Sequence, residues 1–322
     1  MSFSNELKSE AAKIKTDDFN LILAELSAYV RTCGELKLKD GNWIVEFVTE
    51  NASIARRIFT FLKSYTQDLE IYRKKNNQLN KRSNYIIIMK DRNSIDDLLY
   101  DTGFVKNGNY EEKKYEIDKG LLQLDEEIRS FLRASFLGAG SVTDPEKGYH
   151  LELISQNEKL AKDLKDMINK WNLNAKITTR KSSFIVYLKE AEQISDFMAL
   201  IGTNQSLLKF ENVRIVKDLR NNVNRVVNCE TANINKTITA SMKQIDDIKF
   251  IKKLGKFDLL PEDIKEVANL RIENEDSSLN EIAELTNGEY SRSGVNYRLK
   301  KISGLAEKLR GAADERNESK TN

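Results

Sequence analysis

The sequence contains few of the residues that build metal centres and nucleophilic active sites. It has two cysteines, Cys33 and Cys229, far apart in the chain, and a single histidine, His150. Neither cysteine has neighbours at metal-ligand spacing, so we expect two reduced thiols and neither a disulfide framework nor a zinc site. One histidine excludes multi-histidine metal sites and most Ser-His and Cys-His mechanisms. Because His150 lies in the alternating stretch GYHLEL, which is typical of a strand, we expect it to be structural.

Long apolar runs are also missing. The stretch NYIIIM is brief, whereas a membrane span needs roughly 18 to 20 apolar residues. The start, MSFSNELKSEAAKIK, includes acidic residues and no apolar core, so it does not match a secretory signal. With 322 residues the chain is long enough for two or three domains. We therefore expect a cytoplasmic protein of several domains with no membrane contact.

Charge is nearly balanced overall but unevenly distributed. The net charge is +2, yet between Gln205 and Lys256 there are eleven Lys or Arg against five Asp or Glu. From Ser291 to Arg310 there are six Lys or Arg against one Asp or Glu. Basic segments of this kind are typical of nucleic-acid binding, although a solvated face of a helical bundle would have the same charge.

An internal repeat organises the first two thirds of the chain. The stretch LSAYVRTCG at 26–34 aligns with LRASFLGAG at 132–140, at an offset of 106 residues. Small residues recur at every fourth position from two residues before each stretch, as Ala24, Ala28 and Thr32 and as Ser130, Ala134 and Gly138. Residues four apart share one face of a helix, so the sequence predicts two helices that pack with their axes unusually close.

The segments that follow the two helices also correspond. After the first, alternating runs around Asp40-Gly41 predict a hairpin, and a helix with Ser53 as its N-cap comes next, followed by two strands and a short helix. After the second come a strand at YHLELIS, a helix capped by Asn157, two strands and a helix. Both halves therefore have the order helix, strands, helix, strands, helix, which predicts a duplicated α+β fold with pseudo-two-fold symmetry.

These features resemble the LAGLIDADG homing-endonuclease architecture, in which two αββαββα halves meet through small-residue helices that end in glycine. Four segments, in this order along the chain, resemble the WhiA family of bacterial DNA-binding proteins: NELKSEAAKI, FLRASFLGAGSVTDPEKGYHLEL, NRVVNCETANINKT and SRSGVNYRLKKI. The resemblance covers almost the full chain. It implies a degenerate endonuclease scaffold followed by an all-α helix-turn-helix domain. It also implies a nucleoid-associated transcription regulator of cell division and chromosome segregation, and of sporulation or development in spore formers.

The resemblance argues against catalysis. Active homing endonucleases carry a metal-binding carboxylate at the next-to-last position of each motif, and here these positions are Cys33 and Ala139. Magnesium takes oxygen ligands, so neither a thiol nor a methyl group can replace a carboxylate. Glu35 and Asp144 lie nearby but are displaced from the helix ends. We expect no enzyme activity, metal or cofactor; the alternatives are a residual metal-dependent DNA endonuclease and a regulatory module whose saddle binds a ligand or a protein.

The C-terminal segment predicts a helix-turn-helix from Ser278 to Arg310. A first helix begins at Pro261, a second is capped by Ser278, Gly288 marks the turn, and a third helix begins at Ser291. The expected core contacts join Val295, Leu299 and Ile302 of the third helix to Leu279, Ile282 and Leu285 of the second. The third helix is therefore the predicted recognition helix.

The opposite face of this third helix carries the expected DNA contacts. The N-terminal part of a recognition helix enters the major groove, where arginine can pair with guanine and asparagine with adenine. The candidates for base contacts are Arg292, Ser293 and Asn296. The candidates for phosphate contacts are Tyr297, Arg298, Lys300 and Lys301, together with the backbone amides at Ser291.

The sequence also predicts the domain limits and the partners. The expected parts are a first repeat with the N-terminal segment at 1–115, a second repeat at 116–205, a basic, mainly helical linker at 206–256, a helix-turn-helix domain at 257–310 and a disordered tail at 311–322. In the linker, secondary contacts with the DNA backbone are expected from Lys217, Arg220, Arg225 and Lys236, whereas Asn224, Asn228 and Asn233 are expected to cap helices and brace the domain junction. We expect a monomer that binds double-stranded DNA, with other transcription or division proteins as further partners.

Overall fold

The computed structural model describes residues 2–75, 83–106, 108–118 and 120–318. The chain divides into two compact units, Met1–Asp218 and Leu219–Asn322, called here the N-terminal and the C-terminal unit. Within the described residues, no helix combines the length and the apolar character needed to cross a membrane.

The N-terminal unit contains the two predicted halves. The first half consists of α1 (Phe3–Ala11), α2 (Phe19–Thr32), β1 (Gly34–Lys39), β2 (Asn42–Thr49), α3 (Ala52–Leu62), β3 (Leu69–Lys75), β4 (Ser83–Met89) and α4 (Arg92–Asp101). The second half consists of α5 (Asp125–Ala139), β5 (Gly140–Val142), β6 (Leu151–Ser155), α6 (Glu158–Asn169), β7 (Lys176–Arg180), β8 (Ser183–Leu188) and α7 (Ala191–Leu200).

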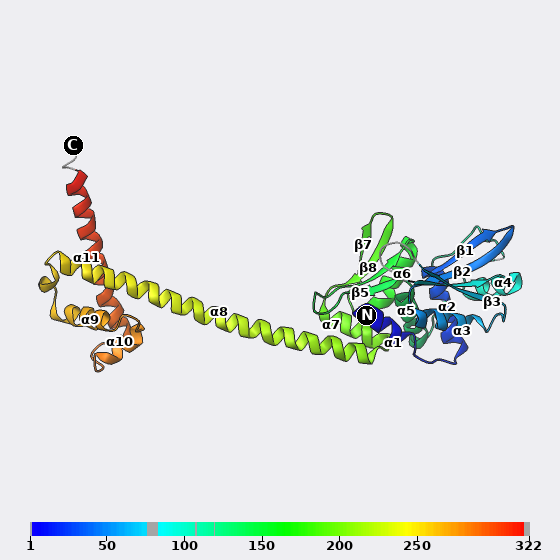
Figure 1. The fold of residues 1–322 in the computed structure, drawn as a ribbon, viewed down its shortest axis with the longest axis horizontal. Coiled ribbons are helices and arrows are strands. Elements are labelled where there is room, and N and C mark those ends of the chain that lie inside the picture. Colours follow the sequence, from blue (N-terminus) through cyan, green and yellow to red (C-terminus); the bar gives the residue numbers. More distant parts are fainter. Residues whose placement is uncertain (1, 76–82, 107, 119, 319–322) are drawn as a thin grey trace. The chain divides into compact units, whose positions relative to one another are not determined.

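Each half forms its own four-stranded antiparallel sheet, and the two sheets have the same topology. The strand orders are β1-β2-β4-β3 and β5-β6-β8-β7. The register repeats as well, since Gly34 faces Phe47 in the first sheet and Gly140 faces Leu153 in the second. α2 packs along α5 at the centre of the unit, between the two sheets (Figure 1). The structure confirms the predicted duplicated α+β fold.

Local signals in the sequence account for most of these elements. The β1–β2 hairpin turns at Asp40 and Gly41, with φ of 50° and 77°, as predicted. The side chain of Asn157 caps α6, also as predicted. The prediction of Ser53 as the cap of α3 was wrong, because Asn51 accepts hydrogen bonds from the backbone N–H groups of Ser53 and Ile54 and the helix begins earlier. The three-residue strand β5 was too short to be predicted from alternation.

The small-residue stripes form the seam between α2 and α5. Ala24, Ala28 and Ala134 are fully buried there. At Gly138 an added Cβ would lie 2.2 Å from the Thr32 Oγ1 atom and 3.0 Å from its Cβ. Thr32 cannot turn away without cost, because its hydroxyl donates a hydrogen bond of 2.7 Å to the Ala28 carbonyl. The seam therefore requires glycine at position 138.

Replacing Gly138 with alanine is expected to lower the free energy of unfolding of the N-terminal unit by about 1–3 kcal/mol, the usual cost of overpacking. Urea unfolding followed by tryptophan fluorescence measures this, because the two tryptophans, Trp43 and Trp171, both lie in this unit. Gly148→Ala is the control, since an added Cβ there meets nothing within 4 Å. Equal stability of the Gly138 and Gly148 variants would contradict a close-packed seam.

The long helix α8 (Asn204–Lys253) crosses the boundary between the units. Its N-terminus is held by Glu10, whose carboxylate accepts hydrogen bonds of 2.8 Å from the backbone N–H groups of Gln205 and Ser206. An acidic side chain at this place also interacts favourably with the helix dipole. Residues 221–240 of α8 are all exposed.

The C-terminal unit is all-helical. After α8 come the short 3-10 helix η1 (Phe257–Leu259), α9 (Glu262–Glu273), α10 (Leu279–Leu285) and α11 (Arg292–Glu318). Its core also contains Ile248 and Ile251 of α8, so this core begins within the segment that we expected to be a linker. We expected a disordered tail at 311–322; α11 continues through Glu318 into this segment, and residues 319–322 lie outside the described residues.

Candidate nucleic-acid interface

Side-chain caps fix the start of the two C-terminal helices of this unit. Ser278 and Glu281 form a capping box at α10, as the sequence predicted for Ser278. At α11 the Ser291 hydroxyl accepts a hydrogen bond of 3.3 Å from the Gly294 N–H, and the hydroxyls of Ser291 and Ser293 lie 2.8 Å apart. The first turn of α11 is therefore well defined.

One side of α11 is buried against α10 and α9. Val295, Leu299 and Ile302 are buried and contact the core around Ile282, as predicted. Leu285 is 46% exposed, so the prediction that it joins this core was wrong. It is the last residue of the short helix α10, and the buried residue at this end of the helix is its C-cap, Thr286.

The opposite side of α11 faces solvent. Asn296 is half-buried, and the exposed candidates for DNA contacts are Arg292, Ser293, Tyr297, Lys300 and Lys301. The Tyr297 ring is 58% exposed and lies 4.6 Å from the Lys301 ammonium. The exposed side therefore combines basic groups, an amide and an aromatic ring at the N-terminal end of one helix.

Arg298 differs from its neighbours because its guanidinium is held within the unit. Its Nε donates to the Asp263 carboxylate at 3.0 Å and its Nη1 to the Gly294 carbonyl at 3.2 Å. The guanidinium also lies 3.6 Å from the centre of the Tyr290 ring. These contacts join α11 to α9 and to the preceding turn, so Arg298 positions the helix rather than projecting from it.

Buried polar groups that the sequence did not reveal hold the same helices together. Asp247 of α8 is almost fully buried and accepts a hydrogen bond of 2.6 Å from Arg310 of α11. Arg271 of α9 is buried, which lowers its pKa, and it donates to the Ser241 hydroxyl and the Ser277 carbonyl. The partners of Asp247 and Arg271 lie far from them in the sequence or form no recognisable local motif with them. The sequence therefore contains no signal for these contacts.

The candidate contacts on α8 divide into two groups. The Lys217 side chain is engaged in contacts within the N-terminal unit: its ammonium donates a hydrogen bond of 2.6 Å to the Pro145 carbonyl and lies over the Tyr149 ring. Arg220, Arg225 and Lys236 are exposed. The prediction that the linker asparagines cap helices was wrong: Asn224, Asn228 and Asn233 lie inside the continuous helix α8 and are exposed.

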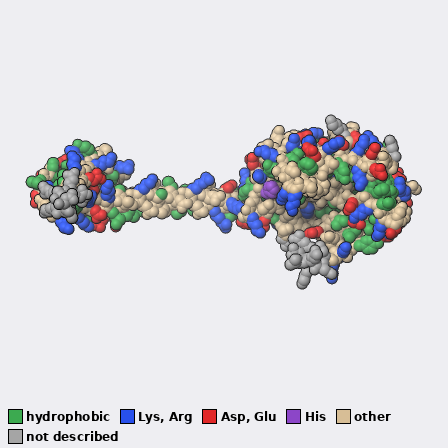
Figure 2. Space-filling view, turned by 90° about the horizontal axis from the view of Figure 1, so that it is seen from above, with side chains coloured by type: hydrophobic (Ala, Val, Ile, Leu, Met, Phe, Trp, Pro, Cys, Tyr) green, Lys and Arg blue, Asp and Glu red, His purple; other side chains and the backbone are tan. Residues whose placement is uncertain are grey.

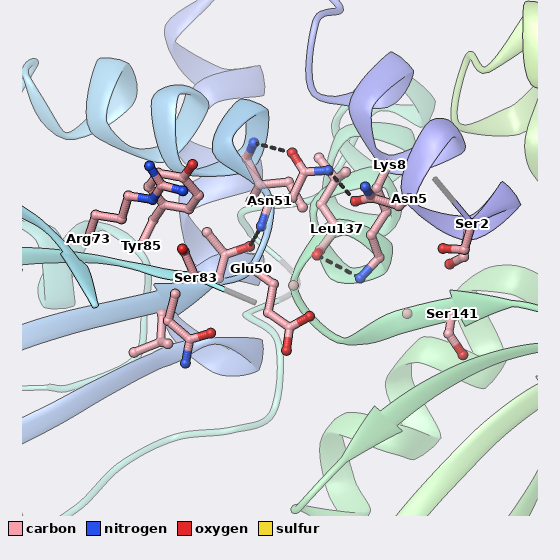
Figure 3. A pocket seen from close by; sticks show the side chains of 17 residues that line it. Ser2, Asn5, Lys8, Glu50, Asn51, Arg73, Ser83, Tyr85, Leu137 and Ser141 are labelled. Atoms are coloured by element: carbon pink, nitrogen blue, oxygen red, sulfur yellow. Dashed lines mark hydrogen bonds between the residues drawn. The ribbon is translucent and has the colours of Figure 1, made fainter. Parts of the chain in front are cut away.

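The positions that correspond to nuclease carboxylates lie at the ends of α2 and α5. Cys33 is the C-cap of α2 and Ala139 is the last residue of α5. Burial raises the pKa of the Cys33 thiol to about 12 and lowers the pKa of the Lys8 ammonium to about 8. The Lys8 ammonium donates to the Leu137 carbonyl at 3.2 Å (Figure 3), so a cationic group of the chain itself occupies the C-terminal end of α5.

A hollow of about 1000 Å³ opens beside Lys8. Its lining is mainly polar and includes Ser4 and Asn5 of α1, Asn51, and Arg73 of β3 (Figure 3). Glu35 and Asp144, the displaced carboxylates, are not part of this lining. Glu35 pairs with Lys37 at 2.9 Å, and Asp144 accepts hydrogen bonds from the backbone of its own loop. No three His, Cys, Asp or Glu side chains of the described residues converge to hold a metal.

Models of known families match most of the chain. The WhiA N-terminal LAGLIDADG-like domain matches residues 20–105, the WhiA LAGLIDADG-like domain matches residues 128–220, and the WhiA C-terminal HTH domain matches residues 223–306. The third match begins within α8, in agreement with the contribution of Ile248 and Ile251 to the core.

Individual proteins are similar over nearly the full length. A Clostridium botulinum (strain Hall) protein with the name "Probable cell division protein WhiA" is 44% identical over 312 residues, which cover 96% of this chain and 99% of the relative. A protein of the same name from Staphylococcus aureus (strain JH9) is 46% identical over 313 residues, which cover 96% and 98%. The crystal structure of full-length DUF199/WhiA from Thermatoga maritima is similar with a TM-score of 0.58 and 25% identity, over 96% of this chain and 99% of that one.

Proposed function

The chain belongs to the WhiA family, and from this premise we propose that it is a sequence-specific DNA-binding protein that regulates transcription in bacterial cell division and chromosome segregation. The observation that carries the proposal is the solvent-facing N-terminal end of α11 in a unit that matches a helix-turn-helix domain. A helix presented in this way fits the major groove of duplex DNA.

The roles of the α11 residues follow from their chemistry and exposure. Arg292 and Asn296 are the proposed base readers, because a guanidinium can bond guanine and an amide can bond adenine with two hydrogen bonds each. Ser293 lies beside them in the first turn. The proposed phosphate contacts are Tyr297, Lys300, Lys301 and the amides at Ser291, with Arg220, Arg225 and Lys236 of α8 as secondary contacts. Lys217 and Arg298 are left out because their side chains are engaged within the fold.

Phosphate contacts predict a steep dependence of binding on salt. If the full-length chain neutralises about four phosphates, its Kd for duplex DNA should rise on the order of a hundredfold between roughly 50 and 200 mM salt. The double variant Lys300→Ala, Lys301→Ala should reduce the slope of log K against log salt by about two. Fluorescence anisotropy at several salt concentrations measures both. A flat salt response of the wild type would argue for a partner other than DNA.

We further propose that the endonuclease-like scaffold does not cleave DNA. Its helix ends carry a thiol at Cys33 and a methyl group at Ala139 instead of carboxylates. The Lys8 ammonium at the end of α5 would also repel a divalent cation placed there. The fold therefore supplies a scaffold at this place without the ligands that metal-assisted hydrolysis requires.

Supercoiled plasmid incubated with the full-length chain and Mg²⁺ or Mn²⁺ is expected to remain supercoiled, as read on an agarose gel. A preparation of the Lys8→Met variant should give the same result, because removing the ammonium does not restore carboxylates. Nicking by the wild type that disappears in Glu35→Gln or Asp144→Asn would overturn the proposal and identify a displaced metal site.

A further inference from the structure

A row of asparagine side chains follows one side of α8 within the C-terminal unit. Six asparagines lie between Asn221 and Asn235, and every residue from 221 to 240 is exposed. Asparagine is a weak helix former, and inside a helix it cannot act as a cap. These residues therefore contribute little to the stability of the helix, and their side chains are available to a partner.

The asparagines are concentrated on one face. At 3.6 residues per turn, Asn221, Asn224, Asn228 and Asn235 fall within about 60° of one another around the helix axis. We call these four residues the asparagine row. Asn222 and Asn233 point roughly 130–150° away from it.

Apolar residues occupy the other side of the helix. The exposed side chains of Leu219, Val223, Val226 and Ile234 fall there, at angles about 110–170° from the centre of the asparagine row, whereas the exposed Val227 and Ile238 lie between the two sides, at about 90° and 70°. The buried Ile245 and Ile248 continue on the same side, where α8 enters the core of the unit. The asparagine row therefore faces away from the side that packs.

The charges beside the row suit a polyanion. The segment from Leu219 to Ala240 contains the basic residues Arg220, Arg225 and Lys236 and one acidic residue, Glu230. Arg225 and Lys236 flank the row, whereas Glu230 falls about 150° away from its centre, among the apolar side chains. In the space-filling view, tan atoms cover most of the exposed part of α8, with scattered blue and green side chains and little red (Figure 2).

We propose that the asparagine row is a second DNA-contacting surface, which lies along a groove of duplex DNA beyond the segment that α11 reads. Amide side chains can donate to and accept from base edges, and they carry no charge that must be desolvated. Ala232 and Thr239, on the same side, are small enough for close approach. From Asn221 to Thr239 the row extends about 27 Å, most of one turn of B-form DNA.

The inference rests on the proposed function, because it assumes that the C-terminal unit binds DNA. A matched pair of variants tests it in the full-length chain. Asn224→Ala with Asn228→Ala removes two amides from the row, and Asn222→Ala with Asn233→Ala removes two amides from other sides of the same helix. Alanine is the better helix former, so both variants keep α8 helical, which circular dichroism verifies.

The probe is a duplex of about four helical turns, selected by the wild-type chain from a random-sequence pool. The row variant should bind it at least about tenfold more weakly and leave a shorter hydroxyl-radical footprint, whereas the control variant should match the wild type. Wild-type affinity and footprint for both variants would overturn the inference, and so would an equal loss in both. If the α11 variant Arg292→Ala also bound like the wild type, the proposed function itself would fail instead.

Discussion

Replacing Glu25 with glutamine is expected to lower the free energy of unfolding of the N-terminal unit by about 3–5 kcal/mol, the usual cost of breaking a buried ion pair. The Glu25 carboxylate is fully buried and accepts two hydrogen bonds of 2.6 Å from Arg57 of α3. It accepts a third, of 3.1 Å, from Arg133 of α5. Glutamine has nearly the same shape but no charge, so both guanidiniums would lose their counter-ion inside the protein.

The effect should be large because Glu25 organises several elements at once. Arg57 also donates to the backbone carbonyls of Ala12 and Ile14, and Arg133 donates to the Ile201 carbonyl at 2.9 Å. The carboxylate therefore connects α2, α3 and α5 with two chain segments outside them. Loss of its charge would loosen the contact between the two halves as well as the pair itself.

Urea unfolding followed by tryptophan fluorescence tests this, with Glu35→Gln as the matched control. Glu35 pairs with Lys37 on the surface and its side chain is 64% exposed, so the control should lose no more than about 1 kcal/mol. If Glu25→Gln lost as little as Glu35→Gln, the buried cluster would not stabilise the N-terminal unit and this reading of its energetics would be wrong.

Replacing Arg292 or Asn296 with alanine is expected to weaken binding to the selected DNA by about 1–3 kcal/mol each, roughly five- to 150-fold, and to relax the choice of base at one position. Arg292 is exposed on the first turn of α11 and Asn296 lies one turn further on. Neither residue is part of the core of the C-terminal unit. The variants should therefore fold like the wild type, as circular dichroism would verify.

Lys308→Ala controls for the loss of one positive charge. Lys308 is exposed on the same helix, but it lies about 12 Å beyond Lys300 along the axis, away from the end that would enter the groove. We expect a change of less than about threefold with unaltered base preference, as for a distant phosphate contact. Equal losses in Arg292→Ala and Lys308→Ala would indicate nonspecific charge attraction in place of base reading.

Local patterns in the sequence were sufficient for most of the elements and for the buried side of the recognition helix. The hairpin at Asp40-Gly41 needs only residues that tolerate positive φ, and the spacing of Val295, Leu299 and Ile302 defines one helical face. The repeat at 26–34 and 132–140 predicted the seam, because small residues four apart allow helices to approach closely. These features depend on neighbours in the chain.

Contacts between distant residues could not be predicted in this way. The spacing along α11 placed Arg298 beside the exposed face, but its partner Asp263 comes from α9, 35 positions away. Nothing near Glu25 in the sequence indicates that Arg57 and Arg133 meet it. The asparagines of α8 were misread for a related reason: asparagine commonly caps helices, and only the continuous helix shows that no helix starts or ends there.

The most direct test of the account is selection of duplexes from a random-sequence pool by the full-length chain and by the double variant Arg292→Ala, Asn296→Ala. We predict that the wild type enriches one motif and that the variant, at a concentration that retains the same amount of DNA, no longer enriches it. Enrichment of the same motif by both proteins would contradict the assignment of base reading to α11.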